Sequence, residues 1–180
     1  HSMGLTDDGT VLSFGDGKDG QLGHGDEEGQ RVPKVIEALR GMRVVAIAAG
    51  GDHSMVLTNE GEVLSFGSGC NRKLGHGDYK DQLEPMVIAC EALRGVHVVA
   101  IAAGLEHSLV LTDAGAVLSF GEGDFGRLGH GDKQDKHVPK VIEALRGVRV
   151  VAIAAGGYHS MVLTDDGKVL SFGFGKYGQL

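Results

Sequence analysis

The sequence predicts an all-β fold, a β-propeller built of four-stranded blades. The first observation is an internal repeat, because the hexapeptide His53–Thr58 returns at 107–112 and 159–164, at spacings of 54 and 52 residues. The second is that each copy holds four short apolar runs, and four strands in about 50 residues are typical of one blade. The third is composition: glycine makes up 31 of 180 residues and proline only 3, which favours tight turns over a disordered linker.

The first two elements of a copy are short apolar runs. Val44–Ala49 contains three alanines, and small side chains suit a crowded strand beside the propeller axis, so we expect it to be the inner strand. His53–Thr58 predicts the second strand. The turn signal Asn59-Glu60-Gly61 then predicts a hairpin into the third strand.

The last two elements flank a glycine-rich loop. Val63–Phe66 predicts the third strand, which Gly67 ends, and the loop Leu74-Gly75-His76-Gly77-Asp78 follows. Pro85–Ile88 predicts the fourth strand. Its counterpart in the first copy, Pro33–Arg40, also fits a helix of two turns. We expect an edge strand running into a turn, because proline is tolerated at the start of an edge strand.

The chain is expected to form one partial propeller over residues 1–180, with repeats at about 1–52, 53–106, 107–158 and 159–180. Ala89 and Cys90 are a two-residue insertion without counterpart in the other copies. About 3.4 repeats of about 52 residues cannot close a ring, since propellers need roughly 4 to 8 blades. We therefore expect association with another chain, a second copy or a complementary propeller fragment, to complete the ring.

Charge and composition exclude several classes of function. The 17 basic and 24 acidic residues give a net charge of −7, which argues against direct binding of nucleic acid or of an anionic membrane. No apolar run approaches the ~18 residues of a membrane helix, and no signal peptide is visible. Two cysteines are too few for a disulfide scaffold. These features predict a cytoplasmic or nuclear protein, and the absence of tryptophan excludes a tryptophan-based photoreceptor.

Several motifs recur together at fixed spacing over the whole chain. They are Val-Leu-Ser-Phe-Gly, Leu-Gly-His-Gly-Asp and Ala-Ala-Gly-x-x-His-Ser-x-Val-Leu-Thr. This combination resembles the repeat of the regulator of chromosome condensation family. The resemblance implies a β-propeller, most often of seven blades. Family members carry out nucleotide exchange on a Ran-type small GTPase, ultraviolet sensing, or partner recognition inside large ubiquitin ligases, so the fold alone does not give the function.

The motifs that could carry chemistry have structural interpretations. Gly15-x-Gly17-x-x-Gly20 matches a dinucleotide-binding pattern, but the sequence after it cannot start the helix that such a site needs. Histidine recurs once in each glycine-rich loop and once at each second strand, and we expect both sets to form structural hydrogen bonds. The neighbouring His53 and Ser54 should point to opposite faces of a strand. The sequence thus predicts no enzyme, no cofactor and no metal site.

Positions that vary between near-identical copies are the candidate binding residues. Aromatic, basic and acidic side chains gather there, as in protein-binding surfaces: Asp52, Arg72, Tyr79, Glu106, Phe125, Tyr158, Phe174 and Tyr177. The leading hypothesis is a non-enzymatic interaction scaffold that uses variable rim loops to bind a protein with basic patches. Unselected loop tips are the plain alternative.

Two further functional alternatives stay open. One is guanine nucleotide exchange on a Ran-type small GTPase, although no loop is long enough to form a wedge against the nucleotide. The other is a fragment or designed repeat protein without a function of its own, because residues 32–41 and 138–147 are identical.

Overall fold

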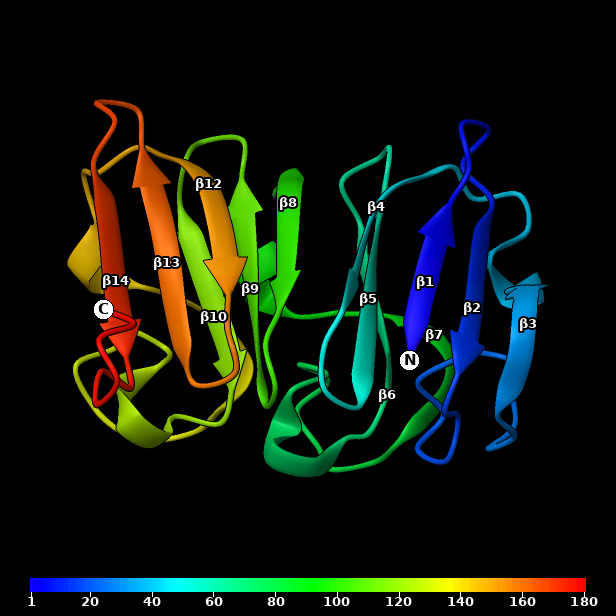
Figure 1. The fold of residues 1–180 in the computed structure, drawn as a ribbon. Coiled ribbons are helices and arrows are strands. Elements are labelled where there is room, and N and C mark those ends of the chain that lie inside the picture. The colour runs from blue at the N-terminus through cyan, green and yellow to red at the C-terminus, as the bar shows by residue number, and fades with distance from the viewer.

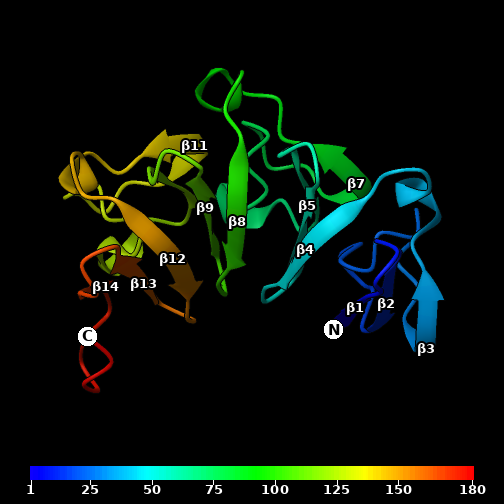
Figure 2. The same cartoon turned by 90° about the horizontal axis from the view of Figure 1, so that it is seen from above.

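The computed structural model describes residues 1–180 as four antiparallel β-sheets that stand side by side in an open arc (Figures 1 and 2). The fold is all-β, as the repeats predict, and its only helical pieces are five 3-10 turns of three residues each: η1 (Glu37–Leu39), η2 (Cys70–Arg72), η3 (Glu91–Leu93), η4 (Asp124–Gly126) and η5 (Glu143–Leu145).

Each sheet uses strands that are consecutive in the chain. The first sheet has three strands: β1 (Ser2–Leu5), β2 (Val11–Gly15) and β3 (Gln30–Val35). The second and third have four each: β4 (Val44–Ala49), β5 (His53–Thr58), β6 (Val63–Gly67) and β7 (Gln82–Val87), then β8 (Val98–Ala103), β9 (His107–Thr112), β10 (Val117–Gly121) and β11 (Lys136–Val141). The fourth has three: β12 (Val150–Ala155), β13 (His159–Thr164) and β14 (Val169–Gly173).

The proline-containing elements are edge strands, which confirms the choice made from the sequence. The expected start at the proline was wrong, because each strand begins three residues before it, at Gln30, Gln82 and Lys136. β3, β7 and β11 each close one side of their sheet, and Figure 2 shows them on the outer side of the arc. The helix considered for Pro33–Arg40 is reduced to the turn η1. The alanine-rich first strands β4, β8 and β12 contact one another from sheet to sheet, as expected for inner strands.

The core lies between neighbouring sheets. Met55 and Leu57 of the second sheet pack in one cluster with Val110, Leu118 and Phe120 of the third. The rings of Phe120 and its counterpart Phe66 are fully buried. Each sheet therefore needs a neighbour to bury its apolar face, which is the packing logic of a repeat protein.

The fourth sheet shows what an uncovered face looks like. Leu163 is 36% exposed and Val169 is 58% exposed, whereas the equivalent Leu57 and Val63 of the second sheet are 2% and 3% exposed. The same side chains are core residues where a following sheet covers them and surface residues where none does.

A histidine and a serine join each pair of neighbouring sheets. The imidazole Nε2 of His53 lies 2.9 Å from the hydroxyl of Ser108, and His107 lies 2.8 Å from Ser160. The Ser108 hydroxyl gives its only proton to the carbonyl oxygen of Lys73, 2.8 Å away, so the imidazole must be the donor to serine. The histidines are thus structural, as predicted, but they bond across sheets and not to a loop beside them.

His53 and Ser54 point to opposite faces of β5, as expected for adjacent residues of a strand. His53 forms its hydrogen bond with the third sheet, while the Ser54 hydroxyl forms a hydrogen bond of 2.8 Å with His1, which precedes β1 of the first sheet. The two side chains therefore form no nucleophilic pair.

The second set of histidines holds each glycine-rich loop to its own sheet. His76 Nε2 lies 3.0 Å from the hydroxyl of Ser65, which itself donates to the carbonyl oxygen of Leu74 at 2.7 Å. The same arrangement recurs at His24 and His130. This confirms the loop-to-strand hydrogen bonds predicted from the repeat, and it fixes the loops that carry the variable residues.

Candidate functional site

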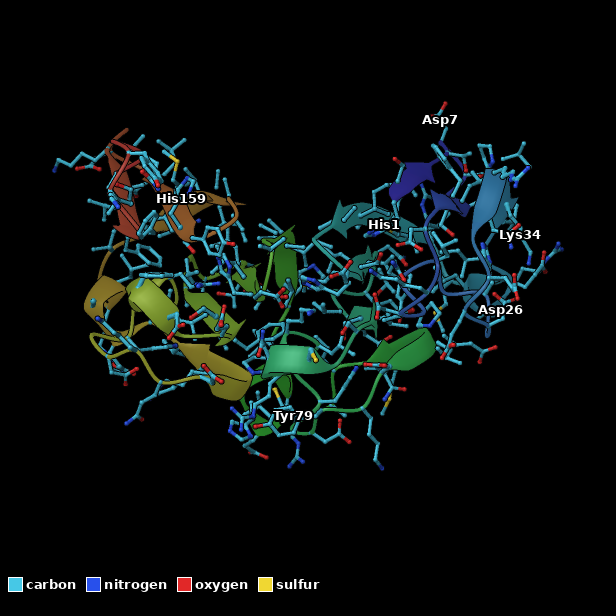
Figure 3. All side chains as sticks on the ribbon, turned by 60° about the horizontal axis from the view of Figure 1, so that its bottom comes forward. His1, Asp7, Asp26, Lys34, Tyr79 and His159 are labelled. Atoms are coloured by element: carbon cyan, nitrogen blue, oxygen red, sulfur yellow. The ribbon has the colours of Figure 1, made fainter.

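All eight candidate binding residues lie along one edge that the four sheets share. We call this edge the loop rim. It consists of the segments that follow β2, β6, β10 and β14 and those that precede β5, β9 and β13: residues 16–29, 50–52, 68–81, 104–106, 122–135, 156–158 and 174–180. These segments share one end because His53 pairs with Gly67, so β5 begins where β6 finishes. Figure 3 brings this rim forward, with Asp26 and Tyr79 on it and Asp7 at the opposite end.

The loop rim carries almost all of the net charge. Its segments hold 13 acidic and 7 basic residues, a net charge of −6 out of the −7 of the chain. The strands and the opposite rim are therefore close to neutral, and the electrostatic field that an approaching partner meets comes from the loop rim.

Four of the candidate residues meet in an aromatic cluster, which we define as Phe125, Tyr158, Phe174 and Tyr177. The ring centroids of Phe125 and Phe174 are 4.7 Å apart, and Tyr158 lies 6.2 Å from Phe125 and 6.3 Å from Phe174. Tyr177 extends the cluster from Phe174 at 5.7 Å. Loops of the third and fourth sheets thus bring together residues that are far apart in the sequence.

A buried arginine supports the aromatic cluster from below. The Arg127 guanidinium lies 5.0 Å from the Tyr158 ring centroid and 5.6 Å from that of Phe125, within the range of cation–π attraction. Its side chain is 1% exposed and pairs with Glu122 at 2.6 Å. By contrast, Phe125 and Tyr158 are 47% and 44% exposed, so the cluster is held from inside and open outside.

Arg72 and Tyr79 form a second group. The Arg72 guanidinium lies 4.2 Å from the Tyr79 ring centroid and bonds the Asp135 carboxylate of the third sheet at 2.9 Å. The Tyr79 ring also meets His137 edge-on at 6.3 Å. This group therefore ties the loops of the second and third sheets together.

Glu106 and Asp52 occupy equivalent loops but have different surroundings. Glu106 bonds the buried Lys73 ammonium at 2.6 Å and the Asn71 amide at 3.3 Å. Asp52 lies near Asp19, whose pKa is raised by burial first and then by the negative charge of Asp52. Glu106 is thus neutralised within the fold, whereas the carboxylates around Asp52 repel one another.

Backbone strain also concentrates on the loop rim. The residues with positive φ other than glycine are Asn71 (57°), Arg72 (62°) and Phe125 (60°). Branched or bulky side chains rarely adopt this conformation, and it persists where the surrounding structure over-determines it. All three lie in η2 and η4, so the strain sits beside the candidate residues.

The sequence did not single out the buried cations Lys73 and Arg127 as parts of the site. Lys73 and Arg127 replace Gln21 of the first copy, so variation between copies was an available signal. Their burial could not be expected, because lysine and arginine are seldom buried without a partner.

The structure contains neither a metal cluster nor a dinucleotide site. No group of three or more histidine, cysteine or carboxylate side chains is placed to hold a metal ion. The glycine pattern at Gly15–Gly20 leads into turns and then β3, without the helix that would face a pyrophosphate. No helix of the chain is long and apolar enough to cross a membrane.

Comparisons with known proteins agree with the architecture. The chain is 43% identical to human E3 ubiquitin-protein ligase HERC2 and 41% identical to the ultraviolet-B receptor UVR8 of Arabidopsis thaliana, over its whole length in both cases. It spans only 4% of the first protein and 41% of the second. Among solved structures, human WBSCR16 superposes with a TM-score of 0.84 at 28% identity, over 96% of this chain and 44% of the other.

A further solved relative is yeast RCC1 (Prp20) bound to Kap60, with a TM-score of 0.79 and 26% identity, over 96% of this chain and 41% of the other. The family model of the RCC1-like domain matches residues 1–180, the full extent of the four sheets. The repeats, the sheet arrangement and these relatives lead to one conclusion, that the chain belongs to the family of RCC1-like domains.

Proposed function

We propose that this chain is a non-enzymatic scaffold that binds a basic protein partner through its loop rim. The observation that carries the proposal is that a net charge of −6 and the exposed aromatic cluster lie on the same rim. Clustered carboxylates raise the rate of association with a basic partner and favour it over acidic proteins. Exposed aromatic rings supply the contacts that usually dominate binding energy.

The rigidity of the rim supports the same function. The loops are fixed by histidine–serine hydrogen bonds and by the ion pairs of Lys73 and Arg127. A preorganised surface loses little conformational entropy when it binds. The yeast relative solved with Kap60 is an example of a protein of this fold in complex with a protein partner.

The test is affinity capture from a cell extract at low and moderate salt, with the purified chain as bait. We expect captured proteins to be rich in lysine and arginine, to elute as salt rises, and to be lost with Phe125→Ala and Tyr158→Ala. Met42→Ala is the matched control, because Met42 is 41% exposed outside the loop rim. Retention of no protein, or capture unchanged by both rim variants, would contradict the proposal.

A nucleotide-release assay separates this function from the alternative. If the chain accelerated release of GDP from a Ran-type GTPase, its partner would be that enzyme, and the scaffold proposal would be wrong. We expect release at the uncatalysed rate.

A further inference from the structure

We propose that the loop rim binds one extended peptide segment that has basic residues at one end and a bulky apolar side chain at the other. The basic end lies over the loops of the first two sheets, and the apolar side chain rests on the aromatic cluster. This inference builds on the proposed function, since it names the chemistry and the orientation of the partner.

The charge of the loop rim is graded along the arc. Segments 16–29 and 50–52, where the first two sheets meet, hold six acidic residues and one lysine, a net charge of −5. Segments 68–81 and 104–106 hold three of each sign and are neutral. Segments 122–135, 156–158 and 174–180 have a net charge of −1. The attraction for cations is therefore concentrated at one end of the arc.

The acidic end has one internal counter-ion for its six carboxylates. This residue, Lys18, lies 3.9 Å from both Asp16 and Asp19, and Asp52 adds a further negative charge close by. In the middle, Lys73 pairs with Glu106, and Arg72 pairs with Asp135 of the neighbouring segment. A basic segment gains most by placing its charges over the acidic end, because acidic residues outnumber basic ones six to one there and are equal in number in the middle.

The aromatic cluster suits an apolar group better than a second cation. The inner side of the Phe125 and Tyr158 rings already faces the Arg127 guanidinium, and Lys176 lies 5.9 Å from the Tyr177 ring centroid. A second cation would have to compete with these two for the electron-rich ring faces. A bulky apolar side chain would instead remove exposed ring surface from water, which is the main source of affinity at such clusters.

The two ends are too far apart for one small ligand. The acidic end lies between the first and second sheets, and the aromatic cluster between the third and fourth. Packed sheets are about 10 Å apart, so the ends are separated by about 20 Å. An extended chain advances about 3.3 Å per residue, so about six residues must link the basic end to the apolar anchor.

The experiment uses synthetic peptides with four arginine or lysine residues, a glycine–serine spacer of six residues and one tryptophan, made in both chain directions. The protein has no tryptophan, so a blue shift of the peptide's emission reports burial of the indole alone. Fluorescence titration gives the dissociation constant. We expect one direction to bind at least tenfold more tightly than peptides that lack the tryptophan or carry glutamine for the basic residues.

Variants then assign each end of the peptide to its place. Phe125→Ala should abolish the blue shift but keep salt-dependent binding, while Asp16→Asn, Asp19→Asn and Asp52→Asn together should weaken the salt dependence and keep the shift. A spacer of one residue should lose the gain from joining the two ends. Met42→Ala is the control, and circular dichroism confirms folding of each variant.

Three results would overturn the inference: equal binding with and without tryptophan, equal binding with the short spacer, or equal binding when the basic residues are replaced by glutamine. In those cases the proposed function would still be supported if the rim variants no longer captured proteins from the extract. If the peptide bound tightly but the rim variants captured the same proteins as the parent, the proposed function would be contradicted.

Discussion

His107 of the third sheet donates a hydrogen bond to Ser160 of the fourth, 2.8 Å away, and its other ring nitrogen has no partner in a buried site. The neutral ring fits this site, because protonation would place an unpaired N–H and a positive charge away from water. Burial, then Arg127 and the adjacent His159, lowers the pKa of His107 to about 3. Burial, then Lys73 and His107, lowers the pKa of His53 to about 3.

This pair of pKa values predicts an acid-labile fold. Between pH 6.5 and about 3 the unfolded chain binds protons at His53 and His107 that the folded chain excludes. The free energy of unfolding should therefore be constant above pH 6.5 and fall as pH decreases below it. The slope should be about 1.4 kcal/mol per pH unit for each histidine.

Urea denaturation at pH 7.5, 6.0, 5.0 and 4.5 measures the slope. His107→Gln should lose stability at pH 7.5 and depend less on pH, while the exposed control His97→Gln should match the parent at pH 7.5. A free energy of unfolding that stays constant down to pH 4.5 would show that the two histidines are charged in the fold.

Truncating the buried phenylalanine rings should destabilise the fold strongly. Phe66 and Phe120 are fully buried between sheets, so Phe66→Ala and Phe120→Ala should each lower the free energy of unfolding by about 3–5 kcal/mol. The same change at the partly exposed Phe14 should cost less. Chemical denaturation decides, and losses below about 1 kcal/mol at Phe66 would mean that its ring does not pack between sheets.

Two glycines of one loop provide a matched comparison. Gly75 and Gly77 both have positive φ, 77° and 91°, so alanine at either should cost about 1 kcal/mol for the backbone. A Cβ on Gly75 would also lie 2.8 Å from the Phe120 ring, whereas one on Gly77 meets only Val138, at 3.6 Å. Gly75→Ala should be the more damaging change.

The glycines at the place of Gly77 in the other loops, Gly25 and Gly131, also have positive φ, 83° and 78°. Alanine there should cost about 1 kcal/mol as well. Melting temperatures of the four alanine variants test both statements, and unchanged values for Gly25, Gly77 and Gly131 would refute the strain argument.

Arg72 stands where the other three copies have glycine, and its φ is 62°. Arg72→Gly should relieve the backbone strain and remove the contacts to Asp135 and Tyr79. Arg72→Ala should remove the same contacts but keep the backbone strain. The glycine variant should therefore be more stable than the alanine variant by about 1 kcal/mol, measured by denaturation. Equal stabilities would mean that Arg72 is not strained.

The uncovered apolar face of the fourth sheet predicts self-association. Leu163 and Val169, which pair across β13 and β14, are 36% and 58% exposed, and such faces favour pairing. Light scattering coupled to size exclusion should give about twice the 18.8 kDa of one chain. Val169→Glu should shift the mass toward that of one chain, and a parent species that stays at 18.8 kDa at high concentration would contradict the prediction.

The strands could be predicted from the sequence because each of them recurs, so that the assignment made in one copy can be compared with the others. Variation between copies also located Phe125, Tyr158 and Phe174, but their contact could not be predicted. It depends on how the third and fourth sheets stand relative to each other, which periodicity does not encode. The burial of Arg127 beneath these rings was equally hidden, because a charged residue in a glycine-rich loop is normally expected at the surface.

The histidine–serine contact between sheets has a direction: at each of the three junctions the earlier sheet donates from its histidine and the following sheet accepts at its serine. A duplicated repeat therefore arrives with both halves of the junction already in place. Blades can be gained or lost during evolution without the invention of a new interface, so the length of such a protein is free to drift while its loops diversify.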